Sequence, residues 1–263
     1  MVEILSADAF YTHVAAYMQR LDPTWDNGDW RAHIADEQAI LATALGPANG
    51  RAILDASCGT GRQALALAAL GWQVTAVDYT PAALQIAQER ARQLDLHIRF
   101  QTADMRQLSA SVPQAFDWAI SCMALDNLLD DAEIQAAIAE LWQVLRPHGC
   151  CYIRLRDFDH LLAGKPRYEM REERVLPTGR VLRLEDWIYE SDTHVICIYI
   201  FLHEDLTKPG YRWKTTAYGY RRRALQKADL ARMLRTAGFA DIIFLPQSSP
   251  WSPYAVVAAK AAG

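Results

Sequence analysis

Few cysteines, no long apolar run and no excess of basic residues set the first limits on this chain. The five cysteines among 263 residues are scattered and form no CxxC pair, which disfavours a disulfide scaffold and predicts reduced thiols. The seven histidines show no metal-ligand spacing, so no metal site is expected. Lys and Arg total 27 against 31 Asp and Glu, and this net charge of −4 gives no general attraction to nucleic acid or to an anionic bilayer. No stretch approaches the roughly 20 apolar residues of a membrane span.

The remaining composition is that of an ordinary globular protein, with 51% hydrophobic and 22% charged residues. Domains of roughly 100–200 residues are usual, so the length fits one domain with an insertion, or two domains. Residues 1–8 lack the basic segment and apolar run of a secretory signal. We therefore expect a cytoplasmic protein without a nucleic-acid or membrane partner, while its oligomeric state stays open.

Strands and helices alternate through the first 160 residues. Residues 1–50 look helical, with helices predicted over 7–21 and 34–45. Strands are expected at 51–56, 73–78, 97–101, 116–122 and 150–155, and the helices between them at 61–71, 81–94 and 130–145. This alternation is typical of βαβ units and predicts an α/β fold with a mostly parallel sheet.

The pattern changes after residue 160. Three strands with alternating faces are predicted at 180–190, 193–202 and 211–222. Their short connections suit antiparallel hairpins, which suggests a three-stranded antiparallel insertion in one α/β domain. A helix over 227–237, ended by Gly238, and strands at 240–245 and 254–259 then complete the sheet.

A glycine-rich turn joins the strand that ends at Asp55 to a helix. Gly59 and Gly61 let the backbone approach a ligand closely, and the helix N-terminus favours polar or anionic groups. The pattern Gly59-x-Gly61-x-x-Ala64 also satisfies the dinucleotide-binding fingerprint. Asp78, about 20 residues further on, stands where an acid holds a ribose. Taken alone, the turn is compatible with NAD or with another adenosine ligand.

Three acids favour one of these ligands. Asp55 ends the first strand of the alternating region, Asp78 ends the second, and Asp104 follows the third. Ligands of an open parallel sheet bind at the carboxyl ends of its strands, where all three carboxylates are expected to lie. Without a nearby lysine these acids would repel a pyrophosphate. They suit a cationic, phosphate-free adenosine such as S-adenosylmethionine.

These segments together resemble the motifs of class I S-adenosylmethionine-dependent methyltransferases. The matching segments are residues 53–61, 77–78, 103–105 and 145–149, and the likeness extends over 30–160 and 226–260. It implies the Rossmann-like sheet of that class, mostly parallel with a reversed last strand. It also implies that Asp55 lies near the methionine amino group, that Asp78 binds the ribose hydroxyls, and that the third motif brackets the adenine. The cofactor-binding residues so implied are Asp55, Ala56, Gly59, Gly61, Asp78, Tyr79, Asp104, Met105, Arg31 and Cys122.

A narrower likeness concerns the acceptor. Residues 155–159 are similar to a segment of the glycine/sarcosine N-methyltransferase group, in which an arginine grips the substrate carboxylate and the N-terminal region covers the site. Arg156 would be that anchor, because a guanidinium binds carboxylates bidentately, unless it forms an ion pair with Asp157 or Asp159. The acceptor-binding residues expected on this basis are Arg156, Tyr11, Tyr17, Trp25, Met123 and Asn127.

The chain departs from that group after the fourth strand, where Met123 stands in place of an asparagine. A thioether packs well on a flat ring and offers little to a carboxylate, which favours a larger amine or a ring nitrogen as acceptor. No residue is expected as a general base, although His160 and His194 are the best-placed histidines. Positioning and proximity would carry the reaction.

These observations predict a methyltransferase that transfers a methyl group from S-adenosylmethionine to a small molecule, most readily to nitrogen. The alternatives are an O-methyltransferase, an NAD-dependent oxidoreductase and a binding protein without catalysis, while the net charge disfavours an RNA methyltransferase. The expected divisions are a helical N-terminal lid (1–50), the cofactor-binding core (51–160), the antiparallel insertion near the substrate site (161–223) and the end of the core (224–263).

Overall fold

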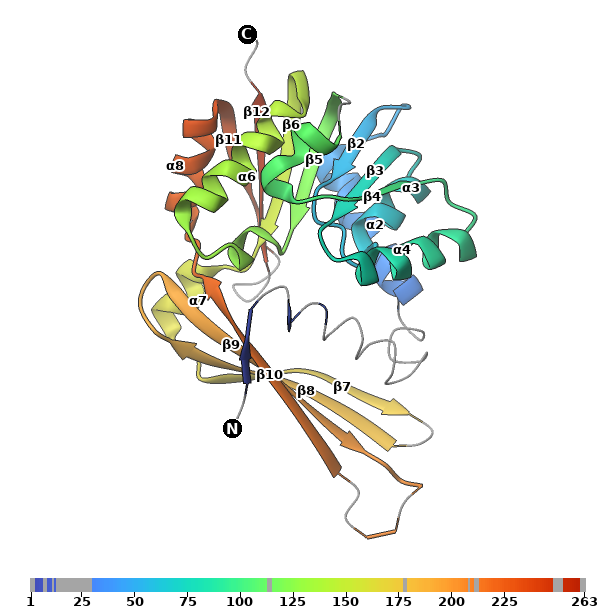
Figure 1. The fold of residues 1–263 in the computed structure, drawn as a ribbon, viewed down its shortest axis with the longest axis vertical. Coiled ribbons are helices and arrows are strands. Elements are labelled where there is room, and N and C mark those ends of the chain that lie inside the picture. Colours follow the sequence, from blue (N-terminus) through green and yellow to red (C-terminus); the bar gives the residue numbers. More distant parts are fainter. Residues whose placement is uncertain are drawn as a thin grey trace.

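The alternating region folds into a seven-stranded sheet (Figure 1). The computed structural model describes residues 3–6, 9, 10, 12, 30–112, 115–176, 179–207, 209, 210, 213–247 and 253–260. The core strands are β2 (Ala52–Asp55), β3 (Gln73–Asp78), β4 (Arg99–Thr102), β5 (Phe116–Cys122), β6 (Leu145–Leu155), β11 (Phe239–Leu245) and β12 (Tyr254–Lys260). Their order is β11-β12-β6-β5-β2-β3-β4, with β2 to β6 parallel and β12 antiparallel to both neighbours. The mostly parallel sheet with a reversed strand is thus confirmed.

Helices cover both faces of this sheet because the strands are apolar on both sides. Ile53 and Leu54 are consecutive on β2, fully buried, and belong to different halves of the core. The half around Ile53 contains α2 (Trp30–Leu45), α3 (Arg62–Ala69) and α4 (Pro81–Gln93), and the half around Leu54 contains α5 (Leu108–Ser111), α6 (Asp131–Gln143) and α8 (Lys227–Ala237). Cys150 and Cys151 likewise pack into different halves, and all five cysteines are free. In the described part of the chain, no helix is long and apolar enough to cross a membrane.

The segment after β6 forms most of a second, five-stranded sheet below the core (Figure 1). After a short helix, α7 (Phe158–Gly164), its strands are β7 (Tyr168–Leu176), β8 (Gly179–Tyr189), β9 (His194–Glu204) and β10 (Trp213–Arg223), joined by β1 (Glu3–Leu5) in the order β1-β10-β9-β8-β7. The insertion therefore contains one strand more than the sequence pattern predicted. The additional strand β7 is an edge strand on which Tyr168, Met170 and Val175 are exposed. Its sequence does not sustain the alternation of apolar and polar residues by which a strand is recognised, because four consecutive charged residues follow Met170.

The N-terminal region differs from the helical prediction at β1, which pairs in parallel with β10. Ile4 lies opposite Gly219, where a Cβ atom would come within 2.7 Å of Ile4 Cδ1, so the glycine makes room for this strand. A strand of three residues is too short to produce a periodicity that could predict it. The predicted helix over 7–21 lies almost entirely outside the described residues, whereas α2 confirms the helix over 34–45.

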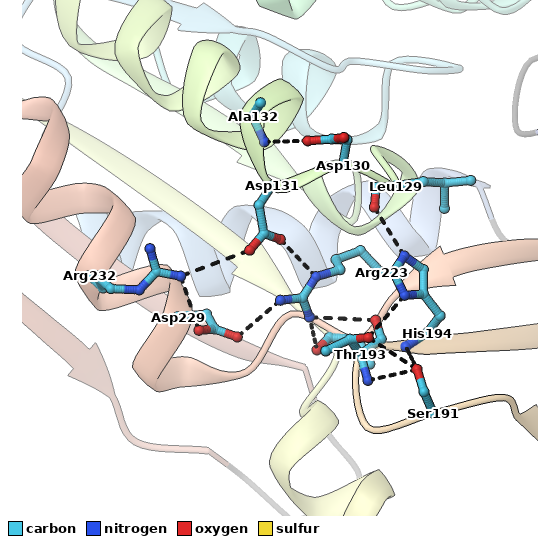
Figure 2. A network of polar contacts seen from close by, with 11 residues as sticks. Leu129, Asp130, Asp131, Ala132, Ser191, Thr193, His194, Arg223, Asp229 and Arg232 are labelled. Carbon is cyan, nitrogen blue, oxygen red and sulfur yellow. Dashed lines mark hydrogen bonds and ion pairs between the residues drawn. The ribbon is translucent and has the colours of Figure 1, made fainter.

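A polar network joins the second sheet to the core (Figure 2). Arg223 ends β10, and its guanidinium donates to Asp131 at the start of α6 (2.8 Å) and to Asp229 in α8 (3.2 Å). His194 begins β9, and its Nε2 lies 3.0 Å from the carbonyl oxygen of Leu129. Because a carbonyl only accepts, this nitrogen carries the proton. The buried Arg223 and the His194 contact thus fix the insertion beside the carboxyl edge of the parallel sheet.

Candidate active site

A cavity of about 560 Å³ lies at the carboxyl edge of the parallel sheet, a usual size for a small-molecule site. The segments that follow β2, β3, β4 and β5 line it. The predicted cofactor residues on its wall are Ala56, Gly59, Asp78, Tyr79, Asp104, Met105 and Cys122, and the predicted acceptor residues there are Met123 and Asn127. Residues from four separate strand ends thus meet at one place, as the sequence predicted.

The two glycines of the first turn have different surroundings. Gly59 has φ +52°, and a Cβ atom on it would meet nothing within 4 Å, so its backbone faces open space at the cavity. Gly61 has φ +92°, and a Cβ atom there would lie 2.9 Å from Ala87 Cβ in α4. Gly61 is buried and is not among the residues that line the cavity. In the structure, Gly61 therefore lets α3 start close against α4.

Asp78 ties the end of β3 to this turn. Its Oδ2 accepts the Gly59 backbone N–H (2.8 Å) and its Oδ1 accepts the Thr80 N–H (2.9 Å). Burial raises the pKa of Asp78, and these two hydrogen bonds oppose that effect. Each carboxylate oxygen keeps a further lone pair, so Asp78 can accept hydroxyl groups from a ligand in the cavity.

Asp55 lies behind the turn, fully buried and not on the cavity wall. Its Oδ1 accepts the Ser57 N–H at 3.3 Å, while its Oδ2 is buried without a hydrogen-bond partner. Burial, with the charges of Asp78 and Glu37 nearby, raises the pKa of Asp55 to about 7. A carboxyl group in this state is stabilised in its ionised form by a cation placed close to it. A positively charged ligand bound at the turn would therefore stabilise the ionised form of Asp55 through its charge.

Asp104 already has a cationic partner on the cavity wall. Arg106 donates to Asp104 Oδ2 at 2.6 Å and also pairs with Glu133, and all three residues line the cavity. The hydrogen bond from Arg106 lowers the pKa of Asp104. Arg106 was not among the predicted site residues, although its place two residues after Asp104 could have indicated the pair.

A second missed group is Glu37 on α2, which is fully buried between two arginines. Arg154 of β6 donates to its two oxygens at 2.5 and 3.0 Å, and Arg62, on the cavity wall, lies 3.1 Å from it. This cluster fixes α2 against the carboxyl edge of the sheet. The sequence did contain an indication that Glu37 has a buried partner, because this acid interrupts the apolar helical face between Ile34 and Leu41. Predicted Arg31 is exposed, lies over the Trp30 ring, and is absent from the cavity wall.

The part of the cavity that was predicted to hold the acceptor follows β5. Met123 has φ +58°, an uncommon conformation for a residue other than glycine, and its N–H donates to Arg154 O at 2.7 Å. Asn127, on the short helix η2 (Leu125–Asn127), donates to the Met123 carbonyl at 3.4 Å. Leu128 and Leu129 extend the wall, so this end is largely apolar.

Arg156 is not on the cavity wall. Its guanidinium forms an ion pair with Glu185 of β8 (3.1 Å) and donates to the Tyr199 hydroxyl (3.0 Å). Asp157 and Asp159, the alternative partners from the sequence, instead accept from Lys227. The predicted acceptor residues Tyr11, Tyr17 and Trp25 lie outside the described residues.

The fold and the site together define a class of protein. A doubly covered sheet with one reversed strand carries a glycine turn after its first core strand and acids after the next two strands, all around one cavity. Residues 53–149 match the family model described as a methyltransferase domain. These residues thus form a methyltransferase domain, and the fold around them is that of the class I S-adenosylmethionine-dependent methyltransferases.

Two curated proteins and one solved structure illustrate what this chain is similar to. A glycine/sarcosine N-methyltransferase of Parasynechococcus marenigrum (strain WH8102) is 30% identical over 151 residues, 56% of this chain and 53% of that protein. A ubiquinone biosynthesis O-methyltransferase of Alkalilimnicola ehrlichii is 34% identical over 110 residues, 41% of this chain and 43% of that protein. The structure of CalS10, an amino pentose methyltransferase from Micromonospora echinaspora, has a TM-score of 0.70 at 18% identity and covers 99% of this chain and 100% of that one. The chain spans about half the length of the curated relatives it matches, and the structural likeness shows the fold alone.

Proposed function

We propose that this protein transfers the methyl group of S-adenosylmethionine to a small molecule, and that the acceptor atom is an amine or ring nitrogen. The observation that carries the proposal is the cavity with Asp78 and Asp104 on its wall and the unpartnered oxygen of Asp55 behind its glycine turn. Acidic groups attract a sulfonium and an ammonium group and repel a pyrophosphate, which supports this cofactor over NAD. The N-methyltransferase activity named for the Parasynechococcus marenigrum relative supports nitrogen as the acceptor.

The residues present fit such a cofactor. Asp78, on the cavity wall, would accept hydrogen bonds from the ribose hydroxyls, and Asp55 would balance the charge of the ammonium group from behind the turn. Gly59 leaves open space for the ligand beside the turn. Tyr79 and Met105 offer apolar surface on the cavity wall where an adenine would lie.

When bound, S-adenosylmethionine supplies a methyl group whose bond to sulfur breaks, with its electron pair kept by sulfur, as the acceptor lone pair forms the new bond. The protein contributes position: Met123 and Asn127 hold the acceptor end, and the apolar side chains beside them exclude water. Alignment of this kind contributes up to roughly 7–11 kcal/mol. The amine proton passes to water, because neither His160 nor His194 is among the described residues that line the cavity.

O-methylation of a small metabolite is the second candidate, favoured by the sequence identity to an O-methyltransferase relative.

A cytoplasmic location is also part of the proposal, and the free thiols of all five cysteines support it.

Titration calorimetry with S-adenosylmethionine, S-adenosylhomocysteine and NAD tests the cofactor assignment. We expect the first two to bind, and Asp78→Asn to weaken S-adenosylmethionine about 10- to 100-fold through loss of charged hydrogen bonds. Glu190→Gln, which alters a surface ion pair with Arg221, is the control and should leave binding unchanged. Tight binding of NAD alone would overturn the proposal.

A further inference from the structure

The arginines of the cavity wall already contact carboxylates of this chain. Arg106 pairs with Asp104 and Glu133, so its charge is neutralised before any acceptor enters. Arg62 lies 3.1 Å from Glu37, a carboxylate that it shares with Arg154. Within the described residues, the wall offers an acceptor no lysine at all.

By the sequence resemblance, Arg156 would bind the acceptor carboxylate. In the structure its two Nη atoms already contact the carboxylate of Glu185. Its Nη1 lies 3.1 Å from Glu185 Oε2 and its Nη2 lies 3.4 Å from Oε1, the two-oxygen arrangement that an acceptor carboxylate would adopt. The guanidinium also lies over the Trp187 ring, 5.1 Å from its centroid. The Glu185 side chain is 2% exposed. Release of Arg156 would leave two buried charges without their partners, which is strongly unfavourable.

The neighbouring buried arginine is engaged in the same way. Arg222 of β10 pairs with Asp126 of η2, and both are buried. Its Nη2 lies 3.3 Å from the Tyr199 hydroxyl, which also accepts from Arg156. Phe10 packs over Tyr199, with ring centroids 5.2 Å apart, and closes this cluster from the N-terminal side. Neither arginine therefore presents a free guanidinium toward the acceptor.

We propose, on the basis of the proposed function, that the acceptor is an amine with an apolar body and no carboxylate, and that Glu185 determines this specificity by occupying Arg156. The wall next to Met123 is apolar at Ala124, Leu128 and Leu129, which suits such a body. The described wall carries three carboxylates, Asp78, Asp104 and Glu133, against two arginines, and this excess of negative charge favours a protonated amine over an acceptor carboxylate. Glycine and sarcosine, which appear in the name of one relative, lack the apolar body and carry the carboxylate.

Matched acceptors test the proposal in the wild-type protein. Benzylamine and phenylglycine differ only in a carboxylate, as do methylamine and glycine, and dimethylamine and sarcosine. We would measure their binding to the protein saturated with S-adenosylhomocysteine by calorimetry, together with kcat/KM for methylation. The member without the carboxylate should be favoured about tenfold or more in each pair, with benzylamine the best acceptor of the set.

Glu185→Gln tests the named residue, because it keeps the shape of the side chain and removes the charge that holds Arg156. In Glu185→Gln, the ratio of kcat/KM for benzylamine to that for phenylglycine should fall at least several-fold. Glu185→Asp, which keeps the negative charge, should restore the wild-type ratio. Glu190→Gln, the same change in an exposed ion pair of the same sheet, should not alter the preference. If Glu185→Gln does not fold, the wild-type pairs alone decide the question.

The proposal is overturned if the carboxylate members bind as well as or better than their partners and lose that binding in Arg156→Ala. It also fails if S-adenosylhomocysteine binds and no amine without a carboxylate does. Failure of the proposed function looks different, because neither S-adenosylmethionine nor S-adenosylhomocysteine would then bind.

Discussion

Replacement of Asp55 by asparagine should stabilise the free protein and weaken its cofactor binding. Asp55 is fully buried, and its pKa is raised from 3.8 to about 7, chiefly by burial. Above neutral pH the folded protein must therefore carry a buried negative charge that costs about 4 kcal/mol relative to an ordinary aspartate. Asparagine keeps the size of the side chain and removes that charge.

The sign of the pH dependence follows from the direction of the shift. Between 3.8 and about 7 the folded protein holds a proton on Asp55 that the unfolded chain has lost. The proton bound to Asp55 stabilises the folded state, and this stabilisation is fully present below pH 3.8. It is lost as the pH rises from 3.8 to about 7, by about 1.4 kcal/mol of unfolding free energy per pH unit. The difference between Asp55→Asn and wild type should therefore grow from pH 5 to pH 7 and level off above it.

Urea unfolding of both proteins at pH 5, 6, 7 and 8 measures this difference and cancels the titrating groups that do not interact with Asp55. S-Adenosylmethionine should bind wild type more tightly as the pH rises through 7, because its positive charge favours the ionised carboxylate. The variant should bind about tenfold or more weakly and without that pH dependence. A stability difference that stays constant from pH 5 to pH 8 would refute the reasoning, as would unchanged cofactor affinity.

Two further substitutions test the packing around the site. Gly61→Ala should lower the unfolding free energy, measured in urea, by about 2–4 kcal/mol, because the new methyl group both strains a positive φ and meets Ala87. Gly71→Ala, at φ +87° and facing open space, is the control and should cost only about 1–2 kcal/mol. Equal costs for the two variants would contradict the close contact at Gly61. Asp126→Asn should lower the unfolding free energy by about 3–5 kcal/mol, because it leaves Arg222 buried without its counter-charge; a loss below about 1 kcal/mol would place this pair in a more hydrated setting.

The sequence predicted the parts of the site that a short motif positions. Gly59 and Asp78 are placed by the strand, turn and helix that contain them, so their local pattern was sufficient to bring them to the cavity. Gly61 belongs to the same motif, but the sequence could not reveal that its free face meets Ala87 of another helix.

The sequence could not predict contacts between distant segments. Glu37 and Arg154 are 117 residues apart, and their pairing depends on how α2 lies against the sheet. Glu185 meets Arg156 only because of the register of β8 in the second sheet and the placement of that sheet against the core. The edge strand β7 and the short strand β1 were missed for a related reason, because neither sequence sustains an apolar–polar alternation of useful length.

Transfer of labelled methyl groups from S-adenosylmethionine to benzylamine tests the central claim most directly. The account predicts that N-methylbenzylamine and S-adenosylhomocysteine form in equal amounts with wild type, and that Asp78→Asn lowers kcat/KM about tenfold or more. Unaltered transfer in Asp78→Asn, or binding of S-adenosylmethionine without transfer to any amine or hydroxyl acceptor, would contradict it.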